Sequence, residues 1–142
     1  MTQTTIDARA LAHDQWLRIT AAVFAVAVVV HGIDHLRRGV DVVTTVVRDV
    51  GAIQFVSGAV VVFLVFRRHR WAPAAAAFVG FASAAGFAAA HLLPHWSAFS
   101  DPYTGSVVAP NVDGFSWFSA MFEIAADLAF GIAGLQALRA RA

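Results

Sequence analysis

The sequence predicts an all-α protein, a four-helix transmembrane bundle with both termini in the cytoplasm. Hydrophobic residues make up 59% of the chain and charged residues only 13%. An average soluble domain carries roughly 25% charged residues, so this chain has too few charges to cover a surface that faces water. Its apolar residues gather in four long segments, each near the ~20 residues that a membrane-spanning helix needs.

The four predicted spans form one membrane domain, residues 19–138, which follows a polar segment, residues 1–18. This first segment carries several charges, which are costly to insert into lipid, so we expect it to stay in the cytoplasm. Residues 41–49 are rich in valine and threonine, but a lone strand in lipid would leave backbone groups unpaired. We therefore expect a loop or the first turns of the second helix there. The predicted spans cover residues 19–36, 50–66, 71–93 and 115–138.

The third predicted span is rich in alanine and ends near a proline. Gly80, Ala84 and Ala88 lie four residues apart and form a stripe of small residues, which allows another helix to approach closely. Pro94 cannot donate a helical hydrogen bond and restricts the residue before it. We therefore expect His95 to leave the helix.

Arginine positions predict the orientation, because cytoplasmic segments of membrane proteins are enriched in basic residues. The Arg-Arg-His-Arg cluster at 67–70 is expected in the cytoplasm, and the connection 94–114, which has no arginine, is expected outside. Arg37, Arg38 and Arg48 break the rule in the first external connection. All basic residues other than histidine are arginine, and alanine and valine are abundant, which indicates the codon bias of a high-GC bacterial genome. With four predicted spans, the expected location is the bacterial inner membrane, as a multi-pass protein.

The composition also limits the partners and cofactors. The chain contains no cysteine, so disulfides, thiolate metal sites and iron–sulfur clusters are excluded. Its net charge of +1 gives no support for nucleic-acid binding. The expected partner is the lipid bilayer, with a homo-oligomer or a larger membrane complex as an open alternative.

The segment His31-Gly-Ile-Asp34-His35 ends the first span and carries the clearest functional signal. Histidines four residues apart lie on one face of a helix, and this spacing is common among metal ligands. The same spacing recurs at the end of the third span, and two carboxylates in the fourth span share it. The residues with this spacing are His31 and His35, His91 and His95, and Glu123 and Asp127.

Helical rise predicts that these polar residues meet in the outer half of the membrane. At about 1.5 Å per residue, counted from the arginines at the cytoplasmic ends of the spans, they fall into two layers. The upper layer holds His35, His91, Glu123 and Asp49, and the lower layer holds His31, Asp127 and Gln54. A charged carboxylate in mid-membrane costs roughly 2.5–3.5 kcal/mol, so Glu123 and Asp127 should face the bundle interior and hold a proton, a hydrogen bond or a cation.

The leading functional hypothesis is a transition-metal site for zinc or iron, because imidazoles and carboxylates suit these ions. The expected metal ligands are His31, His35, His91, His95, Glu123 and Asp127. A haem-binding electron carrier is an alternative, with His31, His35 and His91 as the cofactor-binding residues. Asp34 either pairs with the neighbouring arginines or orients a ligand histidine.

Two further alternatives stay open: a proton or solute transport component in which the carboxylates change protonation, and an accessory membrane subunit whose histidines merely contact water at the interface. No catalytic residue is assigned. If the protein is an enzyme, the expected chemistry is metal-activated water or oxygen acting on a lipid-soluble substrate.

Overall fold

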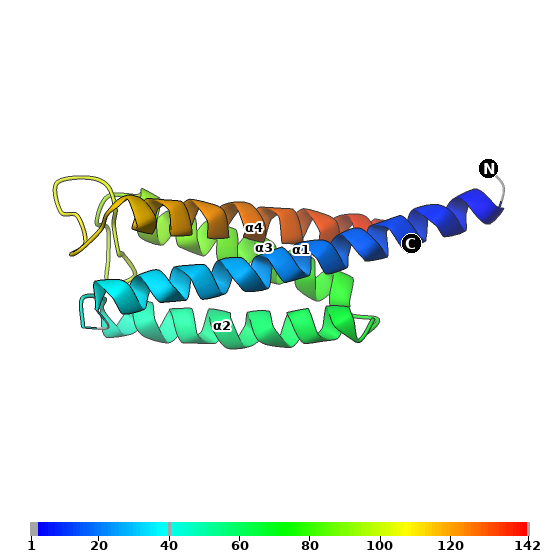
Figure 1. Cartoon of the computed structure of the whole chain (residues 1–142), viewed down its shortest axis with the longest axis horizontal. Coiled ribbons are helices and arrows are strands. Elements are labelled where there is room, and N and C mark those ends of the chain that lie inside the picture. The colour runs from blue at the N-terminus through cyan, green and yellow to red at the C-terminus, as the bar shows by residue number, and fades with distance from the viewer. Residues whose placement is uncertain (1–2, 40, 142) are drawn as a thin grey trace.

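The computed structural model describes residues 3–39 and 41–141, and every regular secondary-structure element within them is a helix. Four long helices lie side by side, with both termini at one end of the bundle and the long connection before the last helix at the other (Figure 1). Each of the four is long and apolar enough to cross a membrane. The predicted all-α bundle is therefore confirmed for the described residues, whereas the cytoplasmic location of the termini stays a prediction.

Helix α1, Gln3–Arg38, is continuous over 36 residues. It has no break near residue 18, the predicted boundary between the polar segment and the first span. Its membrane-compatible stretch begins at Leu11, and its first turns extend beyond the other helices (Figure 1). Residues 1–2 of the polar segment lie outside the described residues.

Helix α2, Thr45–Phe66, begins five residues before the span expected from the sequence. The Thr44 side chain caps it by accepting a hydrogen bond from the backbone N–H of Val47 at 3.2 Å, which satisfies one of the unpaired donors at a helix start. Of the two alternatives for the segment 41–49, the first turn of the helix is therefore the one observed from residue 45 onward.

Helix α3, Ala72–Phe87, continues directly into the π-helical turn η1, Ala88–Leu92. Leu93 is extended, with φ −85° and ψ 147°, as steric contact with a following proline requires. His95 lies beyond the helix in a bend and is exposed, so the expectation that it leaves the helix is confirmed. Single π-helical turns within α-helices are frequent at functional sites, and η1 carries His91.

Helix α4, Gly114–Arg139, starts with a capping box formed by Asp113 and Ser116. It packs against α3 at very short range. A Cβ placed on Gly80 would lie 2.5 Å from the backbone nitrogen of Gly131, and one on Gly134 would lie 2.6 Å from that of Ala77. The small-residue stripe predicted in the third span therefore does mark a close helix contact at Gly80.

The bundle interior is divided along its length. The half near the termini is filled by an apolar core in which the rings of Phe24 and Phe130 pack at a centroid distance of 4.9 Å. The half near the connection 93–113 contains buried polar side chains instead. The buried core residues are Leu17, Ala21, Phe24, Val61, Val65, Ala72, Ala76, Phe130, Ala133 and Ala137.

Candidate metal centre

Three of the predicted site histidines lie together at the polar end of the bundle. His31 and His35 come from α1, His91 comes from η1, and one ring nitrogen of each lies within 4.8 Å of the other two. The ring centroids of His31 are 4.7 Å from His35 and 5.0 Å from His91. In a tetrahedral zinc site with Zn–N bonds of about 2.0–2.1 Å, ligand nitrogens are about 3.3 Å apart. The nitrogens would have to approach one another by at most about 1.5 Å to reach that geometry.

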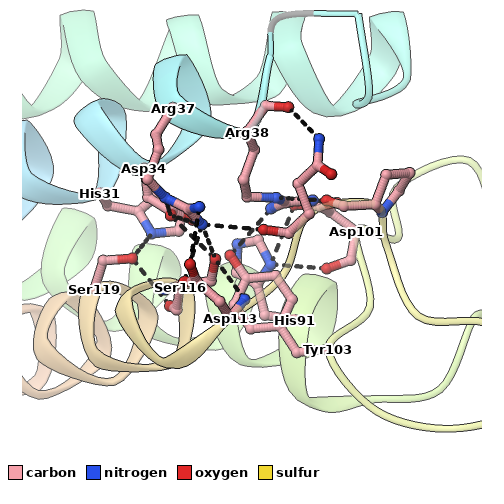
Figure 2. A network of polar contacts seen from close by, with 12 residues as sticks. His31, Asp34, Arg37, Arg38, His91, Asp101, Tyr103, Asp113, Ser116 and Ser119 are labelled. Atoms are coloured by element: carbon pink, nitrogen blue, oxygen red, sulfur yellow. Dashed lines mark hydrogen bonds and ion pairs between the residues drawn. The ribbon is translucent and has the colours of Figure 1, made fainter.

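The tautomer of His91 follows from its hydrogen bond. Its Nδ1 lies 2.9 Å from the backbone carbonyl oxygen of Asp101 (Figure 2). A carbonyl oxygen only accepts, so Nδ1 carries the proton, and in a neutral imidazole Nε2 then keeps its lone pair. An imidazole that donates to a backbone carbonyl through one nitrogen and offers the other is the usual state of a metal-ligating histidine.

The tautomer of His31 follows in the same way. Its Nδ1 lies 3.4 Å from Ser119 Oγ and 3.7 Å from Glu123 Oε2. Ser119 uses its single hydroxyl proton on the carbonyl of Ser116 at 3.0 Å (Figure 2), so it accepts from His31 Nδ1. Nε2 of His31 has no hydrogen-bond partner among the described residues. His31 therefore also offers a free lone pair at Nε2.

The carboxylates of α4 lie beside the histidine cluster and not within it. Glu123 and Asp127 are 1% and 0% exposed, and their four carboxylate oxygens have no hydrogen-bond donor in the described part of the chain. Glu123 approaches the protonated edge of the His31 ring, opposite the free Nε2, and Asp127 lies one turn further along α4. Their burial fits the expectation that each holds a proton or a cation.

The two predicted layers are not observed, because His31 joins His35 and His91. The predicted heights on the first span take Arg18 as the cytoplasmic end of the helix. In the structure Asp14 pairs with Arg68 at 3.7 Å, so Asp14 and not Arg18 marks that end of the bundle. Counting from Asp14 raises His31 by about 6 Å. The exposed His95 and Asp49 are separate from the cluster.

Asp34 forms an ion pair and does not orient a ligand. Its Oδ1 accepts from Arg37 at 2.9 Å and from the hydroxyl of Ser116 at 3.0 Å. Among the described residues, Asp34 forms no hydrogen bond with a histidine. Arg37 also bridges to Asp113 at 2.9 Å. The ion-pair interpretation of Asp34 is thus the one observed, although the carboxylate is fully buried.

The sequence did not identify the group of residues that encloses His91. Arg38 is 2% exposed and Asp101 is 3% exposed, and they form a bidentate pair with distances of 2.6 and 2.7 Å. The Tyr103 ring packs on the His91 ring at a centroid distance of 4.5 Å, and burial raises the pKa of the Tyr103 phenol above its ordinary value. The available signal was the position of Arg38 at the predicted outer end of the first helix, where arginine is disfavoured.

The connection 93–113 folds back onto the end of η1 and completes its hydrogen bonding. Four consecutive carbonyl groups, which a helix end leaves unpaired, accept hydrogen bonds from this connection. The pairs are Trp96 Nε1 to Ala89 O at 2.9 Å, Asp101 N to Ala90 O at 3.0 Å, Tyr103 N to His91 O at 2.8 Å and Thr104 Oγ1 to Leu92 O at 3.1 Å. The connection is therefore a fixed cover over the histidines.

The fold and the cluster define a multi-pass membrane protein with three histidines that can hold a metal ion. Comparison with known proteins adds no family: no family model, curated protein or solved structure matches the chain.

Proposed function

We propose that the protein is an integral membrane protein that binds one transition-metal ion, zinc or iron, through His31, His35 and His91. The observation that carries this proposal is the state of two rings. His31 and His91 each commit Nδ1 to an acceptor, which leaves the lone pair of Nε2 in each ring available to an ion.

The number of ligands also bears on the kind of site. Structural zinc sites have four protein ligands, whereas catalytic sites have three and keep one position for water or substrate. Three histidines, with no fourth protein ligand in the cluster among the described residues, correspond to the second kind. Ser119 Oγ and the Asp101 carbonyl would orient His31 and His91, and such partners typically change metal affinity by 10–100-fold.

A haem fits this arrangement less well than a single ion. The His31 ring makes edge contacts with the rings of both His35 and His91. A macrocycle clamped between two of these histidines would have to separate rings that now touch. A metal ion requires the opposite movement, a small contraction of the cluster.

Proton transfer is a second candidate function, favoured by the buried carboxylates. Asp127, Glu123 and His31 follow one another from the bundle centre toward the cluster, with Glu123 and His31 3.7 Å apart. Such intramembrane chains are typical of proton relays. Proton flux into vesicles with and without the protein would test this function separately from metal content.

Metal content of the purified full-length protein tests the main proposal. We expect about one equivalent of zinc or iron by mass spectrometry, and no Soret band in the absorption spectrum. His31→Asn and His91→Asn should lose the metal, whereas His95→Asn, which changes an exposed histidine outside the cluster, should retain it. Circular dichroism would verify that each variant remains helical. Equal metal content in all three variants, or none in the wild type after metal supplementation, would exclude the proposal.

A further inference from the structure

A cavity of ≈510 Å³ lies between α2 and α3 and reaches the histidine cluster. Its volume is within the range of small-molecule sites, about 300–1,000 Å³. His35 and His91 form part of its wall, and apolar side chains form most of the remainder. The ion proposed above would therefore border this cavity.

The cavity is elongated along the bundle. On α2 its lining extends from Val47 to Ser57, and on α3 and η1 from Phe78 to His91. At 1.5 Å per residue these stretches correspond to about 15 and 20 Å. A chain-like molecule matches this shape better than a compact one.

The side of the cavity faces the bilayer. Ile53 on α2 and Phe78 on α3 line it and are 69% and 75% exposed, within helices apolar enough to span a membrane. Large apolar side chains exposed at that depth contact hydrocarbon. A ligand would therefore enter sideways from the lipid, between α2 and α3.

The end nearest the connection 93–113 is covered. Trp96 and Phe99 line the cavity there and stack at a centroid distance of 6.1 Å. Thr44, the cap of α2, donates a hydrogen bond to the carbonyl of Ala98 at 2.7 Å and holds this cover against the helix. The covered end is also the end that contains the histidines.

Two buried polar atoms of residues that line the cavity have no partner among the described residues. They are Nδ1 of His35 and Nε2 of Gln54, and both are buried. An amide nitrogen can only donate, so Gln54 needs an acceptor oxygen, and an unmet buried donor is costly. A ligand with an oxygen acceptor at one end of a hydrocarbon chain would meet this need.

We propose that the cavity binds one lipid-soluble molecule with a single long hydrocarbon chain and a carbonyl or carboxylate head group. Its chain lies along α2 and α3, its head oxygen accepts from Gln54, and its head group faces the histidine end of the cavity. The contact between head group and metal rests on the proposed function, whereas the chain site and the Gln54 contact do not.

Fluorescence quenching in nanodiscs tests this site. The reporter is Trp96, with Trp16, Trp71 and Trp117 replaced by phenylalanine, and the probes are bromine-labelled palmitic acid, its methyl ester and a bromine-labelled alkane of equal length. We expect saturable quenching by the acid and the ester, which differ only in the charge of the head group. The alkane should bind at least about tenfold more weakly, because it cannot accept from Gln54.

Matched glycine variants locate the ligand. Gly86 lines the cavity, Gly32 does not, and a Cβ at either position meets no atom within 4 Å. Gly86→Phe should abolish saturable quenching and Gly32→Phe should leave it unchanged. Gln54→Leu should weaken the acid and the ester, but not the alkane, by about tenfold.

Equal quenching of Gly86→Phe and Gly32→Phe would overturn the proposal, as would quenching that rises linearly with each probe. His91→Asn separates this proposal from the metal site. Saturable binding that persists in that metal-free variant supports the cavity even if no metal is found, and metal retained without saturable quenching rejects the cavity alone.

Discussion

Replacing Arg38 by glutamine should strongly destabilise the bundle, because it leaves a buried carboxylate without its cation. Arg38 and Asp101 are 2% and 3% exposed and form two short hydrogen bonds, at 2.6 and 2.7 Å. Removing one partner of a buried ion pair typically costs about 3–5 kcal/mol. At 1.4 kcal/mol per tenfold, this lowers the folding equilibrium constant by roughly a hundredfold to several thousandfold.

The free energy of unfolding can be measured by titrating SDS into mixed micelles and following helicity. Arg141→Gln is the matched control, because Arg141 is 41% exposed and its contact with Asp14 is 3.6 Å long. An exposed pair of this kind contributes about 0–1 kcal/mol. In the double variant Arg38→Gln, Asp101→Asn, no charge is left unpaired, so its loss should be smaller than the sum of the two single losses. Equal losses for Arg38→Gln and Arg141→Gln would refute this reasoning.

Three other predictions concern glycine packing, the α4 cap and the tyrosine. Gly80→Ala should lower the free energy of unfolding by about 1–3 kcal/mol, because the added methyl group forces α3 away from α4. Gly86 has open space around it, so Gly86→Ala should not lower the free energy of unfolding. Equal losses in the two variants would contradict the close contact between α3 and α4. Hydrogen bonds from Ser116 and Phe115 lower the pKa of Asp113 below 3.8, so its cap should stabilise α4 above that pH and be lost as the pH falls through the lowered value, with Asp113→Asn removing this pH dependence. Burial raises the pKa of Tyr103, the only tyrosine in the sequence. Ultraviolet titration should therefore show its ionisation above pH 10 in the folded protein, and the free energy of unfolding should fall as the pH rises through that range. Ionisation at the ordinary pKa would contradict the burial of Tyr103.

The fold was predictable because lipid imposes a simple requirement on composition. Four apolar segments of sufficient length follow directly from the sequence, and helices satisfy their backbone groups within lipid. The approach of α3 to α4 at Gly80 was also predictable from the small-residue spacing. The continuity of α1 was not, because the charges of residues 1–18 describe solubility and do not mark a helix end.

The site was predictable in part. His31, His35 and His91 followed from their spacing and position, and the structure brings these three together. The role of the connection 93–113 could not be read from the sequence, because Asp101 is paired with a residue 63 positions earlier. Long-range pairs of this kind leave no local periodicity.

The Arg38–Asp101 pair has a consequence for how the chain is made. Arg38 is synthesised 63 positions before its partner Asp101. Arg37 is synthesised 76 positions before its partner Asp113. During translation the two guanidinium groups therefore lack their distant carboxylate partners until the third hydrophobic segment has left the ribosome. We expect the carboxyl end of the first helix to reach its final depth late in biogenesis, and a ribosome stalled before residue 101 to hold an incompletely inserted hairpin.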